Sequence, residues 1–249
     1  MDSLGRSIRI RDATVDDSLQ AIARVYFEGF STTVLHQRLF PGGGSPSAKE
    51  KYMCRLRKDV SLDPFSTSPV RVIVKVAELL PHNGEEPKII ALAKWKFVKE
   101  SLPVEMWKVK KQDVVTEEEV GEGVNLELWR TFNGKMQQFQ AEAMRGDRCL
   151  HLGSLVCHPD YRGLGAARAL LQWGVELADK ERIPAFLEAS PHCYPLYKRF
   201  GFQDIGMYEF ALPDTGLIDD KDLGAEMCPE WGAKPKGFLR AAIMRRLPR

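Results

Sequence analysis

The chain lacks any long hydrophobic run. No stretch of its 249 residues approaches the roughly 20 apolar residues that a membrane-spanning helix needs. The N-terminus carries an early acid, Asp2, and lacks the apolar stretch of a secretory signal. The 36 Lys and Arg residues nearly balance the 34 Asp and Glu residues, so the net charge is only +2. A chain with so little net charge has no bulk attraction to nucleic acid. We therefore expect a cytoplasmic protein that binds neither membrane nor nucleic acid.

Patterns typical of metal sites and disulfide frameworks are missing as well. The five cysteines are scattered and odd in number, and none forms a CxxC pair. The five histidines form no HxxxH pair and no mixed set with the cysteines. The sequence therefore predicts no metal site and a reducing compartment.

The hydrophobic pattern that is present predicts an α/β chain. Strands are expected over residues 7–11, 70–77, 88–97, 150–156, 183–189, 202–212 and 238–247. Helices are expected over residues 47–60, 126–145, 167–180 and 191–200, and one further helix is expected to follow Thr14 as its N-cap. An Asn-Gly pair at residues 83–84 predicts a tight hairpin turn between the second and third strands.

Residues 99–148 interrupt this pattern. The first half of the segment is strongly charged, and apolar side chains then recur at three- and four-residue steps: Trp129, Phe132, Met136, Phe139 and Ala143. That spacing predicts one amphipathic helix. We expect the helix to pack on the domain; the alternative is that it also roofs a substrate pocket.

The most informative segment is RGLGAA at residues 162–167. It lies between the strand at 150–156 and the helix that follows. Glycines let a ligand approach the backbone, and a helix start offers free N–H groups and positive dipole charge, so the segment predicts a phosphate cradle. No Lys-Ser or Lys-Thr pair follows, which excludes a P-loop. Arg168 occupies the third glycine position of a dinucleotide fingerprint, which disfavours that site too.

Two motifs indicate which phosphate is bound. Residues 155–167, LVCHPDYRGLGAA, resemble the signature of the GNAT superfamily of acyl-CoA N-acyltransferases, with Arg162, Gly165 and Ala167 on its fixed positions. Residues 196–202, LYKRFGF, resemble the LYxxxGF segment of the same family. The resemblance is dense over residues 150–210 and absent from residues 99–148 and the last ~35 residues. Those two extra segments resemble those of uncharacterised fungal members.

The resemblance implies a single α/β (α+β) domain over residues 1–249. Its central sheet would be mixed, mostly antiparallel and flanked by helices, with an insertion at about 99–148 and a C-terminal extension from about 213. Two central strands would splay apart, and the pantetheine arm of acetyl-CoA would lie between them like an added strand. The resemblance does not choose between a monomer and a homodimer.

The same resemblance implies which residues hold acetyl-CoA. Backbone N–H groups of residues 163–168 would bind the pyrophosphate, and the strand before them would face the pantetheine. Ser190 stands where the family commonly places an asparagine. The expected cofactor-binding residues are Leu155, Val156, Cys157, Arg162, Gly163, Leu164, Gly165, Ala166, Ala167, Arg168, Ser190 and Tyr194.

GNAT enzymes typically transfer the acyl group directly, so Cys157 is expected to be a wall residue rather than a nucleophile. Tyr197 falls on the position of the family's proton donor and is assigned as the general acid; the alternative is a packed core tyrosine. Glu188 is assigned as the general base, with Glu28, Glu142 and a water chain left open.

The acceptor cleft would be built by Phe27, Phe30, the loop near Pro41, Trp129 and Phe132. This set is aromatic and only mildly acidic, which favours a small amine with apolar character. Two alternatives stay open: acetylation of a protein N-terminus or lysine, and a non-catalytic module that binds acyl-CoA.

Overall fold

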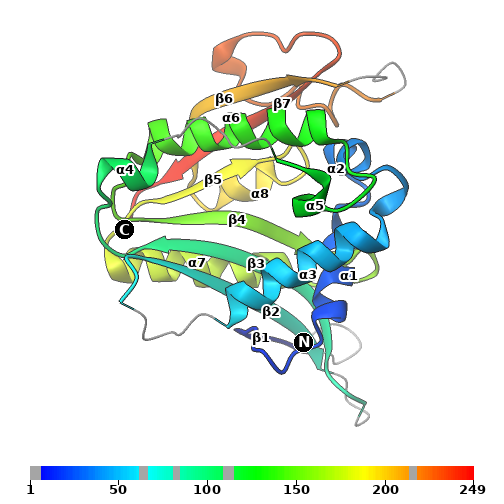
Figure 1. Ribbon diagram of the computed structural model, residues 1–249. Helices are drawn as coiled ribbons and strands as arrows, with labels where there is room; N and C mark the ends of the chain where they lie inside the picture. Colours follow the sequence, from blue (N-terminus) through cyan, green and yellow to red (C-terminus); the bar gives the residue numbers. More distant parts are fainter. Residues whose placement is uncertain (1–6, 62–66, 81–84, 109–114, 213–217) are drawn as a thin grey trace.

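A computed structural model describes residues 7–61, 67–80, 85–108, 115–212 and 218–249 (Figure 1). These residues form one seven-stranded sheet in the order β1-β2-β3-β4-β5-β7-β6. The strands are β1 (Ser7–Asp12), β2 (Val70–Leu80), β3 (Lys88–Val98), β4 (Cys149–Cys157), β5 (Ala185–Ala189), β6 (Gln203–Ala211) and β7 (Phe238–Arg246). All neighbouring strands pair antiparallel except β4 and β5, which are parallel. The predicted mixed, mostly antiparallel sheet is confirmed.

Helices cover both faces of this sheet. They are α1 (Leu19–Phe30), α2 (Val34–Leu39), α3 (Pro46–Val60), α4 (Val104–Trp107), α5 (Glu117–Val120), α6 (Leu126–Met144), α7 (Ala166–Glu181) and α8 (Tyr194–Arg199). Short 3-10 turns occur at η1 (Pro41–Gly43), η2 (Pro159–Tyr161) and η3 (Pro229–Trp231). Helix α7 packs on β3 and β4 from one face, while α1 packs on the same two strands from the other (Figure 1). Every helix within the described ranges is too short or too polar to cross a membrane.

The predicted cap of the first helix is wrong. Ser18 caps α1, and its hydroxyl accepts a hydrogen bond from Ala21 N. Asp17 accepts hydrogen bonds from Thr14 N (2.7 Å) and from the guanidinium of Arg11. This local turn delays the helix by four residues, because Asp side chains hydrogen-bond nearby backbone groups in preference to joining a helix. The hairpin turn expected at residues 83–84 lies outside the described residues.

The last strand lies in the interior of the sheet. Strand β7 lies between β5 and β6 and pairs antiparallel with both. Its residues 239–244 are all buried because the strand is covered on both faces. Buried Arg240 donates to Glu209 Oε1 and to the carbonyl oxygen of Gly232 (2.8 Å). The strand expected at residues 238–247 is therefore present, and it is an interior strand of the sheet.

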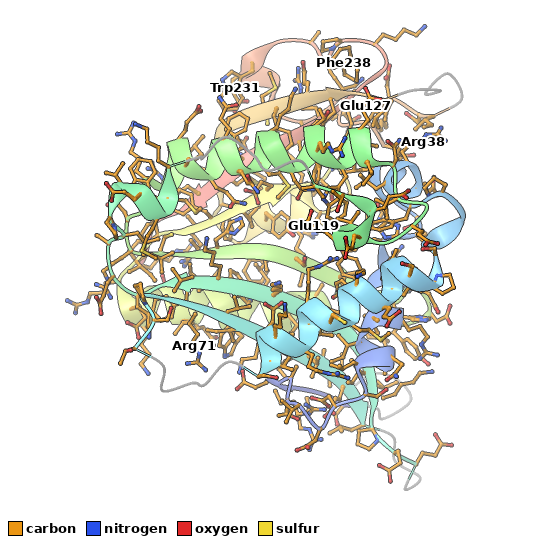
Figure 2. The ribbon with its side chains drawn as sticks, viewed as in Figure 1. Arg38, Arg71, Glu119, Glu127, Trp231 and Phe238 are labelled. Atoms are coloured by element: carbon orange, nitrogen blue, oxygen red, sulfur yellow. The ribbon has the colours of Figure 1, made fainter. Side chains whose placement is uncertain are left out.

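Residues 99–148 contribute α4, α5 and α6. Helix α6 crosses the sheet over β7 and β6 (Figure 1), and its partly buried side chains pack against β6 and β7. Asn125 caps α6 through a hydrogen bond from Leu128 N (3.1 Å). The start of α6, marked by Glu127, lies beside α2, marked by Arg38 (Figure 2). The inserted segment thus forms part of one layer of the domain.

Candidate active site

Strands β4 and β5 separate halfway along their length. They pair only at Leu150 with Ala185, His151 with Phe186 and Leu152 with Leu187. At that point the register between β3 and β4 shifts, and Gly153 of β4 is left without a partner. A β-bulge of this kind bends its strand, so the remainder of β4 turns away from β5 (Figure 1). The splay predicted by resemblance is confirmed, and its cause is the bulge at Gly153.

Two adjoining cavities lie along this gap. The larger, of about 500 Å³, extends over the glycine turn and the start of α7. The smaller, of about 300 Å³, lies between β4, β5, α2 and α6. Both are lined by Phe30, Thr33, Leu155, Ser190 and Cys193. We call the larger one the cradle cavity and the smaller one the acceptor cavity.

The glycine turn has the geometry of an anion cradle. Gly163 and Gly165 have φ of +81° and +88°, in the left-handed region that glycine tolerates. A Cβ atom built on either residue would meet nothing within 4 Å, so both face open space. Gly165 is the N-cap of α7, a helix of 16 residues, whose first N–H groups have no partner within the helix. These amides can hold the diphosphate of acetyl-CoA, so the chain's own residues fit that group.

Most of the expected cradle residues line this cavity. The lining set contains Leu155, Val156, Cys157, Arg162, Gly163, Gly165, Ala166, Ala167, Arg168 and Ser190. Leu164 does not line it, because its side chain packs against the main core. Only its backbone can take part in a cradle.

Arg162 has a different contact from the one expected. Its Nη2 atom donates to the carbonyl oxygen of Gly29 (2.7 Å) and to Thr32 Oγ1 (3.1 Å). The side chain therefore ties the end of α1 to the turn. Helix α1 and strand β4 also pack closely at this point, because a Cβ atom built on Gly29 would lie only 2.2 Å from Val156 Cγ2. The arginine secures a wall of the cavity from the side.

A basic groove continues from the cradle between α7 and α8. This hollow of about 460 Å³ is lined by Arg168, Arg199, Arg246 and Arg249, and it shares Arg168 and Arg199 with the cradle cavity. Arg246 is neutralised by Asp179, with N–O distances of 2.7 and 2.8 Å. Within the part of the chain that the structure describes, Arg168 and Arg199 have no such partner. They can attract a polyphosphate that extends beyond the glycine turn.

Tyr194, which was expected to bind the cofactor, lines neither the cradle cavity nor the acceptor cavity. Its hydroxyl donates to Asp204 Oδ2 (2.6 Å), and Lys198 Nζ lies 3.0 Å from the same oxygen. The Asp204 side chain is only 4% exposed. A buried carboxylate needs such donors, so the role of Tyr194 in this structure is to stabilise the buried Asp204.

Cys157 has the properties of a wall residue. Burial raises the pKa of its thiol to about 11. The same cause raises the pKa of Cys193, which also lines the cradle cavity. Both groups are therefore thiols near neutral pH, whereas a nucleophilic cysteine must be a thiolate.

Tyr197 lines the acceptor cavity beside Cys193, a residue that both cavities share. Its side chain is 5% exposed and packs edge-on against Phe202 with ring centroids 6.1 Å apart. Burial raises the pKa of its hydroxyl well above 10, and the neighbouring Cys193 and Glu188 act in the same direction. The residue is both a core tyrosine and a cavity residue, and it holds its proton at any physiological pH.

Glu188 projects into the acceptor cavity from β5. His151 Nε2 lies 2.8 Å from its Oε2, and Gln140 Nε2 donates to its Oε1 at 3.3 Å. The side chains of Glu188 and His151 are only 10% and 6% exposed. Sequence reasoning missed both partners. A signal was present for His151, which is a polar, ionisable residue between Leu150 and Leu152 in the mostly apolar strand β4.

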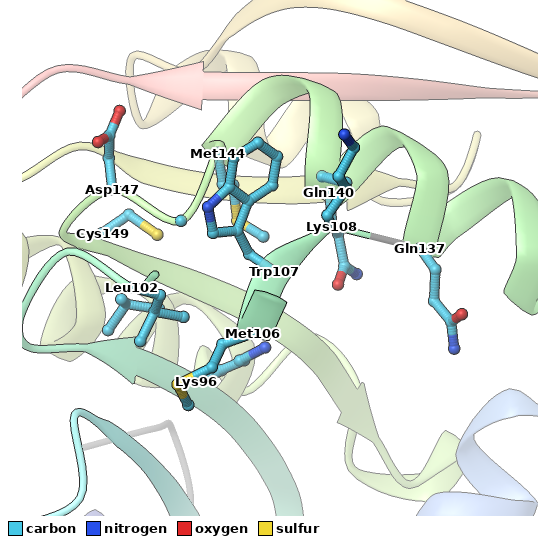
Figure 3. Close-up of a pocket in the computed structure, with 13 residues that line it drawn as sticks. Lys96, Leu102, Met106, Trp107, Lys108, Gln137, Gln140, Met144, Asp147 and Cys149 are labelled. Atoms are coloured by element: carbon cyan, nitrogen blue, oxygen red, sulfur yellow. The ribbon is translucent and has the colours of Figure 1, made fainter. Parts of the chain in front are cut away.

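Gln140 also borders a separate hollow of about 230 Å³ between α4, the end of α6 and the first residues of β4 (Figure 3). Trp107 covers this hollow, and a Cβ on Gly146 would lie 2.1 Å from its indole. The insertion is thereby fastened to the sheet next to the residue that supports Glu188.

The other proposed bases do not reach the cavities. Glu28 Oε2 lies 2.7 Å from His158 Nε2, and Glu142 accepts a hydrogen bond from Gln138 on the exposed face of α6. Neither carboxylate lines the cradle cavity or the acceptor cavity. Within the described ranges, His, Cys, Asp and Glu side chains form no group of three or more that could hold a metal ion.

The rest of the acceptor cavity is aromatic. Phe30, Trp129 and Phe132 line it as expected, and three aromatic side chains that were not expected line it too: Tyr26, Tyr208 and Phe210. Phe27 does not line it, because its ring packs behind the wall against Phe40 at 5.3 Å. Near the loop at Pro41, the residue that lines the cavity is Phe40 rather than Pro41.

Helix α6 forms a wall of this cavity through Trp129, Phe132, Asn133 and Met136. The alternative that this helix also roofs the pocket is therefore the one that the structure supports.

Comparison with known proteins agrees with this geometry. Residues 131–202 match the model of the Acetyltransferase (GNAT) family. The fold is similar to that of a Drosophila melanogaster polyamine N-acetyltransferase, with 15% identity, a TM-score of 0.57 and coverage of 97% of this chain and 100% of that one. An agmatine N-acetyltransferase gives 16% identity, a TM-score of 0.58 and coverage of 96% and 99%. Arylalkylamine N-acetyltransferase 2 from Aedes aegypti gives 16% identity, a TM-score of 0.56 and coverage of 98% of this chain and 100% of that one.

Proposed function

We propose that this chain, which is a GNAT acetyltransferase and uses acetyl-CoA, transfers the acetyl group directly to the amine of a small molecule with an apolar body. One observation carries the proposal. An aromatic cavity of about 300 Å³ with a carboxylate in its wall adjoins the glycine cradle. Its volume is that of a small-molecule site, and its lining suits an apolar amine.

Acetyl-CoA supplies an acetyl group activated as a thioester. Backbone amides of residues 163–168 would hold its diphosphate at the positive end of α7. Arg168 and Arg199 would hold the more distant phosphate in the basic groove. The free edge of β4 beyond Gly153 offers backbone groups to the pantetheine arm. These contacts would orient the thioester toward the acceptor cavity.

Glu188 would act as the base. An amine arrives as an ammonium and must lose a proton before it can attack a carbonyl carbon. A carboxylate has about four lone-pair positions, and His151 and Gln140 occupy two of those on Glu188. The remaining positions can accept the ammonium proton. His151 acts as a positioning residue, because it holds the carboxylate against β4.

Tyr197 would act as the acid. Its side chain lines the acceptor cavity next to Cys193, which both cavities share, and a sulfur leaving in this region would need a proton. The raised pKa of the Tyr197 hydroxyl keeps the proton in place at neutral pH. Glu188 and Tyr197 thus divide the two proton transfers between them.

Small acceptors are favoured over proteins. Helix α6 closes the acceptor cavity on one side with Trp129 and Phe132, whereas a peptide needs an open groove along which its backbone can lie. The similar folds include enzymes named for polyamines, agmatine and arylalkylamines, which are small amines. The cavity beside the cradle also argues against a module that only binds acyl-CoA.

The proposal is tested with a panel of amines and lysine-containing peptides, with acetyl-CoA as donor and release of the CoA thiol as the readout. We expect turnover with small apolar amines and little with peptides. Glu188→Gln should lower kcat/KM by about 10²- to 10⁴-fold, the usual contribution of general-base catalysis. Glu142→Gln, on the exposed face of α6, is the matched control and should leave the rate unchanged. Faster acetylation of peptides than of amines would reject the proposal.

A further inference from the structure

His36 on α2 is a buried polar residue with no polar partner. His36 is only 5% exposed, and neither its Nδ1 nor its Nε2 atom has a hydrogen-bond partner among the described residues. Four aromatic rings surround the imidazole: Phe40 at 4.7 Å, Phe27 at 5.7 Å, Phe30 at 6.0 Å and Tyr26 at 6.2 Å between centroids. Buried polar groups are nearly always paired, so this exception needs an explanation.

The packing does not require a histidine at this position. Burial lowers the pKa of His36 to about 4, so the ring is neutral at physiological pH and carries one donor and one acceptor. A phenylalanine would fill the same aromatic cluster without the cost of two unpaired nitrogens. The histidine therefore weakens the folded state, and a ligand that pairs with it would recover that loss.

The position of His36 indicates what the ligand is. His36 lines the acceptor cavity from α2, and Glu188 lines it from β5. Three of the rings around the imidazole, Tyr26, Phe30 and Phe40, belong to the same cavity wall. A molecule whose amine meets Glu188 would therefore place its apolar body against these rings.

We infer that His36 determines acceptor specificity by hydrogen bonding to an uncharged polar substituent, such as a hydroxyl, on the apolar body of a monoamine. The inference rests on the proposed function. A hydroxyl both donates and accepts, which matches a neutral imidazole. Both nitrogens are buried beneath neighbouring rings, so this hydrogen bond requires one of these rings, such as Phe30 or Phe40, to turn aside when the substituent binds.

Charge selects against a second amine. Of the described residues that line the acceptor cavity, Glu188 is the only one with a formal charge at neutral pH. One ammonium is matched by that carboxylate. The second ammonium of a diamine would lie among apolar rings without a counter-ion, which is unfavourable. The site therefore fits a hydroxylated monoamine better than a polyamine.

The test compares matched probes: phenethylamine, its three ring-hydroxylated isomers, and putrescine. For the wild type, we expect at least one hydroxylated isomer to exceed phenethylamine in kcat/KM by about 3- to 10-fold, the effect of one hydrogen bond. Putrescine should be the poorest probe. In His36→Phe the advantage of the hydroxyl should vanish while phenethylamine is still acetylated. His36→Gln, which keeps a donor and an acceptor, should retain part of that advantage.

The melting temperature provides a second readout. His36→Phe should melt at or above the temperature of the wild type, because it removes two unpaired polar atoms. An unchanged hydroxyl preference in a folded His36→Phe protein would overturn the inference, and so would preferred turnover of putrescine. Either result would leave the proposed function standing. If no amine released CoA, the proposed function would fail and the inference with it.

Discussion

Acid should destabilise this protein through His36. Burial lowers the pKa of that imidazole from 6.5 to about 4. As the pH falls below 6.5, the unfolded chain takes up the proton first, because in the folded state the ring stays neutral until about pH 4. Protonation of His36 therefore costs the folded state nothing above the unfolded pKa, and the free energy of unfolding decreases as the pH falls through the window between the two values.

The size of this loss follows from proton linkage. At about pH 4.5 the unfolded imidazole is almost fully protonated, whereas the folded one is about one-quarter protonated. Proton uptake by His36 in the unfolded chain therefore lowers the free energy of unfolding by about 2.5 kcal/mol at this pH. That is a large share of the roughly 5 to 15 kcal/mol that stabilises an ordinary domain.

Urea unfolding at about pH 7.5 and about pH 4.5, on the wild type and on His36→Phe, measures this contribution. Phenylalanine does not titrate, and every other ionisable group is common to both proteins, so their effects cancel in the difference. We expect the wild type to lose about 2.5 kcal/mol more than the variant on acidification. Parallel losses in the two proteins would refute the reasoning, because they would mean that His36 is not buried as a neutral ring.

Three further substitutions test the site. Gly165→Arg should abolish CoA binding in calorimetry, because the new side chain would enter the cradle. The control is Gly42→Arg, at a glycine that also has a left-handed backbone conformation and faces open space; this variant should bind CoA normally. Equal affinities of the two variants for CoA would reject the cradle. Tyr197→Phe should lower kcat by about 10²-fold with little change in KM, while Tyr194→Phe should lose only stability; a normal rate for Tyr197→Phe would make it a packing residue. Gly29→Ala should lower the free energy of unfolding by about 1 to 3 kcal/mol, because its Cβ would overlap Val156; an unchanged urea midpoint would contradict that packing.

Much of the fold was predictable from local patterns. The bounds of strands β2, β3 and β4 and of helices α3, α6 and α7 were predicted to within a few residues. The reason is that burial of one face imposes a period of two or 3.6 on the sequence itself. Thr14 shows the limit of such reasoning, because a competing hydrogen bond from its backbone N–H to Asp17 moved the start of α1.

The candidate site divides in the same way. The glycine turn was recognisable because its conformation and its helix start are properties of consecutive residues. The partners of Glu188 were not, because His151 and Gln140 are 37 and 48 residues away in the chain. The side-chain bonds of Tyr194 to Asp204 and of Arg162 to the end of α1 were not predictable either, because each joins segments that are separate in the chain.

The sequence by itself therefore determined the elements, the phosphate-binding turn and the family it resembles, since each of these is encoded in residues that are near one another in the chain. Only the tertiary structure decided that the last strand enters the sheet between β5 and β6, that α6 walls the acceptor cavity and that four rings isolate His36. These features depend on which distant faces meet. A contact between residues far apart in the chain leaves no pattern of fixed spacing in the sequence, whereas burial of one face of a helix or strand does.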